Sequence, residues 1–138
     1  MAELPAQAEP RRRRGDLKPN PRLWAALQHG KLLRQILEAF YGRVYRDERL
    51  APFFVHTSLS WAIDHQYGFL AEILSGEKLY FGDRPRNAHH WMVISDELFD
   101  YREELMQRCL EEFGLSELDR AEWRAIEEVF RGQIVKDA

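Results

Sequence analysis

Cysteine is almost missing from this chain of 138 residues: Cys109 stands alone, so no disulfide can form within the chain. A lone thiol suits a reducing compartment, and we expect a cytoplasmic protein. Apolar runs are short, and none approaches the roughly 18 residues of a membrane-spanning helix. The formal net charge of -3 gives no general attraction to nucleic acid. These absences predict one soluble domain without a membrane span and without a nucleic-acid partner.

The sequence also lacks the short motifs of several enzyme classes. It holds no Gly-rich phosphate loop, no cysteine cluster and no HExxH metal motif. No serine lies in a recognisable nucleophile turn, so the sequence gives no positive sign of a Ser-His-Asp site. Any chemistry must therefore come from residues that are scattered along the chain and brought together by the fold.

The N-terminal stretch carries four consecutive arginines, Arg11–Arg14, with no apolar segment after them. That order argues against a secretory or a twin-arginine signal. We interpret residues 1–18 as a disordered basic tail and residues 19–138 as the folded domain. The tail is either a solvated extension or a contact to an acidic partner or to lipid headgroups.

Apolar residues beyond the tail recur at three- and four-residue spacing, the period of a helix with one buried face. No strand pattern and no internal repeat is present, so the predicted class is all-α, with roughly five main helices and some short pieces. Asn20, Ser60, Ser95 and Ser116 are expected to cap helices. The predicted helices run from Pro21 to about Gln28, over residues 31–47, over residues 61–76, from Asp96 to Phe113, and from Ser116 to about Val135.

Four polar side chains interrupt the apolar faces of these predicted helices: Tyr41, His65, Gln66 and Arg102. A buried polar group without a partner costs roughly 1–3 kcal/mol, so each needs protein, water or a bound cofactor beside it. Most tyrosines in such a position reach a backbone carbonyl. A further pair, His89 and His90, is expected on a short helical segment after a loop.

Two histidines on facing helices, His65 and His89, would suit a single metal ion or the two faces of a planar iron cofactor, because imidazole is a good iron ligand. They are too few for a closed zinc site, which needs about four ligands. A porphyrin supplies four nitrogens of its own, so two axial histidines would complete the coordination of its iron. The competing interpretation is that each is a hydrogen-bonded core histidine.

Four blocks in fixed order resemble the truncated globins, the short two-over-two branch of the haemoglobins. They are QILEAFYGRVYRDERLAPFF, HQYGFLAEILSG, LYFG, and AHHWMVI followed by ELFD. The resemblance runs without gaps from about Leu33 to Phe99. It implies a globin-like two-over-two helical sandwich around haem b.

Carried over residue by residue, the resemblance implies that His89 is the proximal iron ligand, with His90 the less favoured candidate. His65 would supply a sixth iron ligand, as in some members of the family. The remaining cofactor-binding positions implied are Tyr41 and Gln66 on the distal side, Phe54 at the haem edge, and Phe69 and Leu70 against the porphyrin.

Arg102 departs from the family pattern, which has Trp or an apolar residue at this position. An isolated buried charge would cost several kcal/mol. We therefore expect Arg102 to reach a haem propionate, an acidic side chain or solvent, with its stem covering apolar surface.

The function that the resemblance implies is binding of O2, NO, CO or related small ligands. NO detoxification or peroxidase-like turnover would need an external reductase, and a redox or ligand-sensing role is favoured if His65 closes the sixth position. The alternative is a haem-free helical module that keeps the globin fold for binding another protein, with Arg11–Arg14 as the segment that contacts the partner.

Overall fold

The computed structural model describes residues 17–77 and 94–134, with side chains up to Arg131. Within these ranges the elements are helices, which confirms the all-α class. Five are α-helices and two are short 3-10 turns. In chain order they are α2 (Pro21–Ala26), η2 (Gln28–Gly30), α3 (Lys31–Val44), η3 (Ala51–Phe54), α4 (Leu59–Ser75), α6 (Asp96–Glu112) and α7 (Glu117–Ile134).

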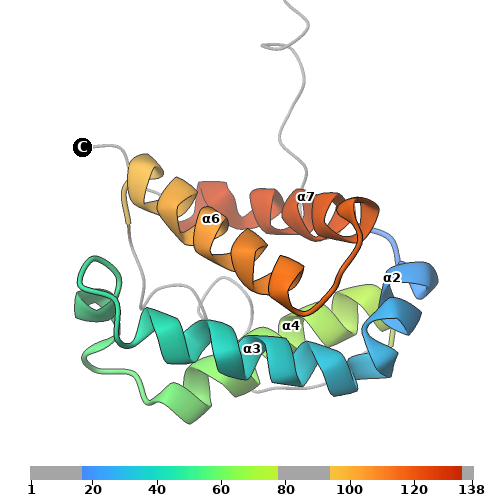
Figure 1. The fold of residues 1–138 in the computed structure, drawn as a ribbon, viewed down its shortest axis with the longest axis horizontal. Coiled ribbons are helices and arrows are strands. Elements are labelled where there is room, and N and C mark those ends of the chain that lie inside the picture. Colours follow the sequence, from blue (N-terminus) through green and yellow to red (C-terminus); the bar gives the residue numbers. More distant parts are fainter. Residues whose placement is uncertain (1–16, 78–93, 135–138) are drawn as a thin grey trace, which may run out of the picture.

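The four long helices form two stacked pairs (Figure 1). Helix α3 packs along α4 in one layer, and α6 packs along α7 in the other. The layers meet where α3 contacts α6, while the short α2 joins them at one end by touching both α4 and α7. This is the two-over-two arrangement that the resemblance to the truncated globins implied.

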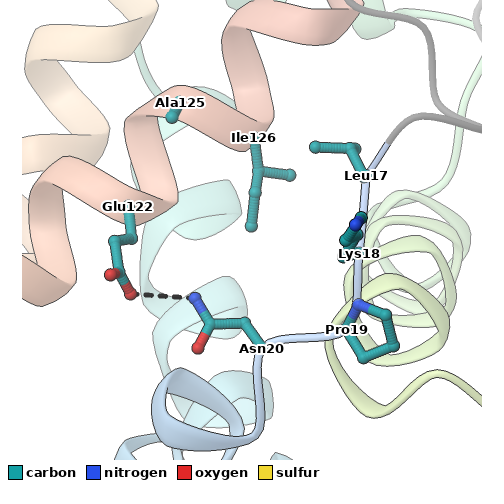
Figure 2. Close-up of a pocket in the computed structure, with 7 residues that line it drawn as sticks. All are labelled: Leu17, Lys18, Pro19, Asn20, Glu122, Ala125 and Ile126. Atoms are coloured by element: carbon teal, nitrogen blue, oxygen red, sulfur yellow. Dashed lines mark hydrogen bonds between the residues drawn. The ribbon is translucent and has the colours of Figure 1, made fainter.

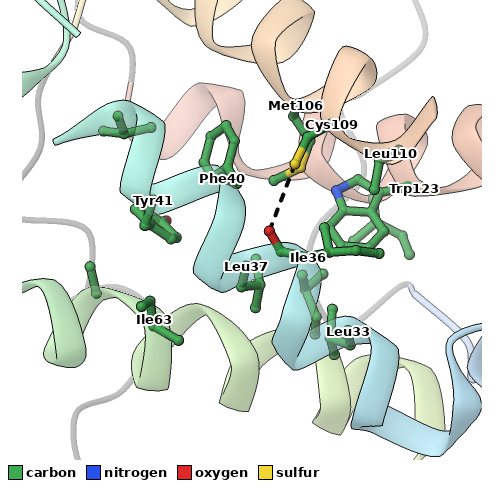
Figure 3. Packing of buried hydrophobic residues seen from close by; sticks show 14 of the residues in the cluster. Leu33, Ile36, Leu37, Phe40, Tyr41, Ile63, Met106, Cys109, Leu110 and Trp123 are labelled. Carbon is green, nitrogen blue, oxygen red and sulfur yellow. Dashed lines mark hydrogen bonds between the residues drawn. The ribbon is translucent and has the colours of Figure 1, made fainter. Parts of the chain in front are cut away.

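The hydrophobic core fills the space between the two layers (Figure 3). Ile36 and Phe40 of α3 meet Cys109 of α6 and Trp123 of α7, and all four side chains are fully buried. Burying a large apolar side chain contributes roughly 1.5–3 kcal/mol, so these contacts contribute substantially to the free energy that holds the two layers together. The thiol of Cys109 also donates to the carbonyl oxygen of Ile36 at 3.8 Å.

Serine and asparagine side chains begin most of the helices. Asn20 Oδ1 accepts from Leu23 N at 3.0 Å, and Ser95 Oγ accepts from Leu98 N at 3.1 Å, as the sequence predicted. The prediction of Ser60 for α4 is wrong. Ser58 has the extended backbone that a cap requires, and its Oγ accepts from Trp61 N at 3.1 Å, which places Ser60 inside the first turn.

Helix α2 ends earlier than the sequence predicted. It was expected to reach Gln28, but Gln28 and His29 both have a left-handed backbone, with φ of 56° and 51°. A left-handed residue cannot continue a right-handed helix, and the conformation is rare outside glycine. Gly30 completes the turn at φ 103° and starts α3. Neither Gln28 nor His29 signals this turn by residue type.

The chain before α2 lies against the end of α4. Asn20 N donates to the carbonyl oxygen of Leu74 at 3.0 Å, and Leu17 packs on the core although it fell in the predicted tail. Gly76 ends α4 at φ 78°, and a Cβ there would come within 2.7 Å of Pro19. Arg11–Arg14 lie outside the described residues. None of the helices described has the length and hydropathy of a membrane-spanning segment.

Candidate functional site

Tyr41 is the polar residue of α3 that the sequence singled out, and it is 1% exposed. Its ring lies 6.0 Å from that of Phe54 and 5.0 Å from that of Phe40, edge-on in both cases. Phe54 belongs to η3, so this short turn places an aromatic ring against Tyr41. Burial raises the pKa of Tyr41, and the charge of Arg102 opposes that rise only in part. The phenol therefore stays neutral and keeps its proton to donate.

Helix α4 contributes the second group of residues. His65 and Gln66 are 6% and 8% exposed, on the same buried face as Phe69 and Leu70. The imidazole of His65 stacks on the indole of Trp61 at 4.5 Å, with only 6° between the ring planes. Phe69 meets the same imidazole edge-on at 4.6 Å. Two aromatic neighbours, one helical turn before and one after, thus fix the position of His65.

Arg102 lies inside α6 at 4% exposure and is paired with acidic side chains, as expected. Its two terminal nitrogens donate to the two oxygens of Glu127, at 3.1 and 3.4 Å. A third contact joins Nη1 to Glu103 Oε2 at 2.8 Å. The guanidinium also lies 5.1 Å from the ring centre of Phe40. Two-point pairing of this kind fixes the direction of a carboxylate as well as its distance.

One cation and two carboxyl groups cannot all be charged in a buried site without excess negative charge, so one acid keeps its proton. Burial and the charge of Glu127 raise the pKa of Glu103 to about 10. Burial alone would raise the pKa of Glu127 too, but the charge and hydrogen bonds of Arg102 bring it below its ordinary value. The cluster is therefore an Arg102–Glu127 ion pair with a neutral Glu103 beside it.

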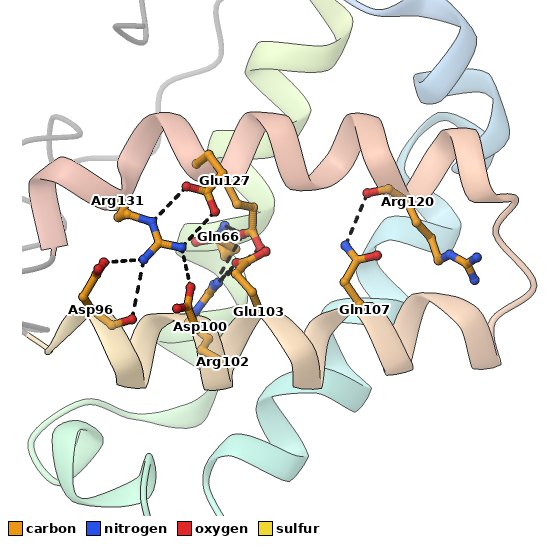
Figure 4. A network of polar contacts seen from close by, with 10 residues as sticks. Gln66, Asp96, Asp100, Arg102, Glu103, Gln107, Arg120, Glu127 and Arg131 are labelled. Carbon is orange, nitrogen blue, oxygen red and sulfur yellow. Dashed lines mark hydrogen bonds and ion pairs between the residues drawn. The ribbon is translucent and has the colours of Figure 1, made fainter. Parts of the chain in front are cut away.

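The cluster reaches the α4 face through Gln66, whose Nε2 donates to Glu127 Oε2 at 3.3 Å (Figure 4). Helices α4, α6 and α7 are thus tied together by one buried polar network. Sequence reasoning found Gln66 and Arg102 but missed Glu103 and Glu127. Both acids occupy core-facing positions: Glu103 follows Phe99 by four residues, and Glu127 follows Trp123 by four. That spacing was the available signal.

The neutral state of Glu103 predicts a stability that depends on pH. The folded-state pKa lies above the unfolded one, so the stabilisation is complete below the ordinary carboxyl pKa near 4.5 and is lost as pH rises toward about 10. Glu103→Gln keeps the shape of the side chain and a hydrogen-bond donor, but the amide cannot ionise. We expect the variant to match the wild type near pH 4.5 and to exceed it by on the order of 3 kcal/mol at pH 7.

Urea unfolding at a series of pH values measures this difference. Glu104→Gln is the matched control, because Glu104 is the next residue and its side chain is 68% exposed beside Arg108. A Glu103→Gln difference that stays constant across the pH range would contradict the neutral state of Glu103.

His89 and His90 lie outside the described residues, so the predicted facing of His65 and His89 stays a prediction. The described chain has a separate groove of about 400 Å³ between the segment before α2 and α7 (Figure 2). Asn20 donates to Glu122 across its floor at 2.8 Å. Among the described residues that line this groove there is neither a histidine nor a cysteine, the side chains that iron prefers.

The residues of α3 and α4 do fit a haem. An iron porphyrin needs apolar walls for its ring and a few hydrogen-bonding groups near its iron. Phe54, Phe69 and Leu70 are buried apolar side chains of the kind that could form such walls, and Tyr41 and His65 are buried polar side chains whose rings contact Phe54 and Phe69. The donor set also suits the group, because imidazole is the usual axial ligand of haem iron.

Two stacked helix pairs with buried tyrosine, histidine and glutamine on α3 and α4 define a small globin-type domain. A family model described as bacterial-like globin matches residues 23–135, and this chain belongs to that family, as a truncated two-over-two globin. Haem b is the cofactor of this family.

Curated relatives agree with that placement. A group 1 truncated hemoglobin of Tetrahymena thermophila is 26% identical over 101 residues, which cover 73% of this chain and 84% of the relative. The group 1 truncated hemoglobin GlbN of Synechocystis is 32% identical over 85 residues, covering 59% of this chain and 68% of the relative.

Solved structures give the same result. The truncated hemoglobin of Tetrahymena pyriformis in its Fe(III) form superposes with a TM-score of 0.73 at 25% identity, covering 83% of this chain and 98% of the other. The 2/2 hemoglobin of Synechococcus, in the cyanomet state with covalently attached heme, gives 0.66 at 27% identity, covering 79% and 98%.

Proposed function

We propose that this chain binds one haem b through His89 and uses it to bind O2, NO or CO. The observation that carries the proposal is the convergence of Tyr41, His65 and Gln66, all at most 8% exposed, from α3 and α4 onto walls of phenylalanine and leucine. A haem with its small ligand matches both the polar and the apolar members of the set.

The haem would supply an iron that binds small ligands and exchanges electrons. The chain supplies the surroundings. The neutral phenol of Tyr41 donates a hydrogen bond to a ligand that carries partial negative charge. Phe69 and Leu70 cover the porphyrin and exclude water. The Synechococcus structure has covalently attached heme; this chain has no histidine after His90, so we propose that its haem is held without a covalent link from the last helix.

The test is optical. Purified protein, reconstituted with haem at one equivalent, should show a strong absorption band near the blue edge of the visible. That band should shift when the reduced protein is exposed to CO. Protein that gives no band and no saturable haem binding would support the alternative of a haem-free helical module, with Arg11–Arg14 as its contact.

We also propose that His65 coordinates the iron opposite His89 when no external ligand is present. Its support is the position of the imidazole, held between Trp61 and Phe69 on the buried face of α4. An incoming O2 must then displace His65, so binding is slowed and the reduced iron is low-spin.

Optical and EPR spectra of the wild type and of His65→Leu test the assignment. We expect the low-spin spectrum of the wild type to become five-coordinate and high-spin in the variant. A wild type that is already high-spin when reduced, and that the substitution leaves unchanged, would refute the sixth ligand while leaving haem binding intact.

The state of the sixth position also bears on the physiological role. A site closed by His65 suits redox or ligand sensing, because ligand binding is then coupled to release of a side chain. An open site suits NO detoxification or peroxidase-like turnover, each of which needs an external reductase. The spectra of the wild type therefore favour one role over the other.

A further inference from the structure

We propose that Glu127, held by Arg102, is a positioning residue that fixes the direction of the Gln66 amide and so limits what Gln66 can donate to a bound ligand. This inference rests on the proposed function, because it assigns Gln66 to the ligand side of the haem. It concerns the hydrogen bond that joins Gln66 of α4 to Glu127 of α7.

The side-chain amide of Gln66 lies beside a buried carboxylate. Gln66 Nε2 lies 3.3 Å from Glu127 Oε2, and both side chains are buried, at 8% and 3% exposure. A buried carboxylate attracts N–H groups and repels carbonyl oxygens, so it distinguishes the two ends of an amide. The nitrogen of Gln66 is therefore directed toward α7 and its oxygen away from it.

The carboxylate of Glu127 is itself held in one orientation. Arg102 binds both oxygens of Glu127, so the acceptor cannot rotate to release the amide. Against the effect of burial, the charge and hydrogen bonds of Arg102 hold the pKa of Glu127 below its ordinary value, so this carboxylate stays ionised while Glu103 beside it is neutral. The amide is thus held by a fixed and fully ionised partner.

The same ion pair acts differently on Tyr41 than on Gln66. The guanidinium of Arg102 lies 5.1 Å from the ring centre of Phe40, whose ring packs edge-on against Tyr41 at 5.0 Å, and its charge opposes the rise that burial causes in the phenol pKa. A cation repels a hydroxyl hydrogen, so we expect the phenol O–H to point away from Arg102. One buried ion pair therefore affects the two residues in opposite ways: the Tyr41 hydroxyl is left to donate to a ligand, whereas one of the two N–H groups of Gln66 is taken by Glu127 and the amide nitrogen is turned toward α7.

Glu127→Met tests the idea directly, because it removes the acceptor but keeps the length of the side chain. The variant has a reason to fold: Arg102 retains Glu103, which can ionise once the competing carboxylate is gone. The freed amide should then donate to the ligand. We expect O2 dissociation to slow by about 5-fold, the effect of one added hydrogen bond, and the infrared stretch of bound CO to move to lower frequency.

Two further variants make the result specific. Glu128→Met changes the next residue, which pairs with Arg131 near the surface, and should leave both readouts unchanged. In a Gln66→Leu background, Glu127→Met should have no further effect on either readout, because a positioning residue acts only through the group it positions. Equal effects of Glu127→Met with and without Gln66 would overturn the proposal, as would lowered stability with an unchanged CO band.

A readout without haem separates this inference from the proposed function. In the apo protein, the side-chain amide resonance of Gln66, identified by its loss in Gln66→Leu, should be protected from solvent exchange and should lose that protection in Glu127→Met. If the protein binds no haem but the Gln66 amide still loses its protection in Glu127→Met, the proposed function is rejected while the Gln66–Glu127 hydrogen bond is supported. Haem binding with an amide that does not respond to Glu127→Met would reject the positioning role.

Discussion

His89→Ala is expected to abolish haem binding, whereas His90→Ala should retain it. The two residues are adjacent in the sequence, and we expect only one of them to be the iron ligand. The sequence blocks that resemble truncated globins align His89, preceded by Ala88, with the proximal ligand. Loss of His89 would remove the proximal imidazole and leave His65, the ligand that an incoming O2 displaces, as the remaining protein bond to the iron, and we expect that bond alone to be too weak to retain the haem.

The measurement is haem titration of both apo variants, followed by the absorption band of the purified complexes. Each variant serves as the control for the other, because the substitutions are identical and neighbouring. Exogenous imidazole should restore the band to His89→Ala by filling the vacated position. Retention of haem by His89→Ala and its loss in His90→Ala would reverse the assignment.

The fold was predictable because its helices have regular apolar stripes and ordinary caps. The stripe of α3, from Leu33 to Val44, is buried throughout, and Ser95 and Asn20 cap as their residue types predict. The errors lie where residue type carries no information. Ser58 and Ser60 are equally good caps by identity, and the backbone alone selects Ser58. Gln28 and His29 adopt a turn that glycine usually marks.

The candidate site was predictable only in part. Tyr41, His65, Gln66 and Arg102 attracted attention as polar residues on apolar stripes, and all are buried. Glu103 and Glu127 occupy equivalent positions but fall among other acids, in the runs Arg102-Glu-Glu and Ile126-Glu-Glu. In each run one glutamate is buried and the next is more exposed, a distinction that depends on the partner helix. Sequence periodicity predicts that a residue faces inward, whereas only the assembled helices show which charge it meets.

The buried ion pair is the feature of this domain whose disruption should cost most. We expect Arg102→Met to lower the free energy of unfolding by about 3–5 kcal/mol at pH 7, because it leaves the Glu127 carboxylate buried without its cation. Losing Arg102 also removes the group that keeps the pKa of Glu127 low. Glu127 should then bind a proton more readily, so the loss should be smaller at pH 5 than at pH 7.

The double variant Arg102→Met/Glu127→Met decides whether the loss comes from the unpaired charge or from packing. It removes both charges and leaves neutral Glu103, so we expect it to recover most of the stability lost in Arg102→Met, since an apolar replacement of a buried ion pair is often neutral or better. Arg108→Met is the control on the same helix: Arg108 and its partner Glu104 are 64% and 68% exposed, and the change should be under about 1 kcal/mol. Urea unfolding of the four proteins at pH 5 and pH 7 gives the comparison. A double variant as unstable as Arg102→Met alone would show that the stem and packing of Arg102, rather than its charge, hold α6 against α7.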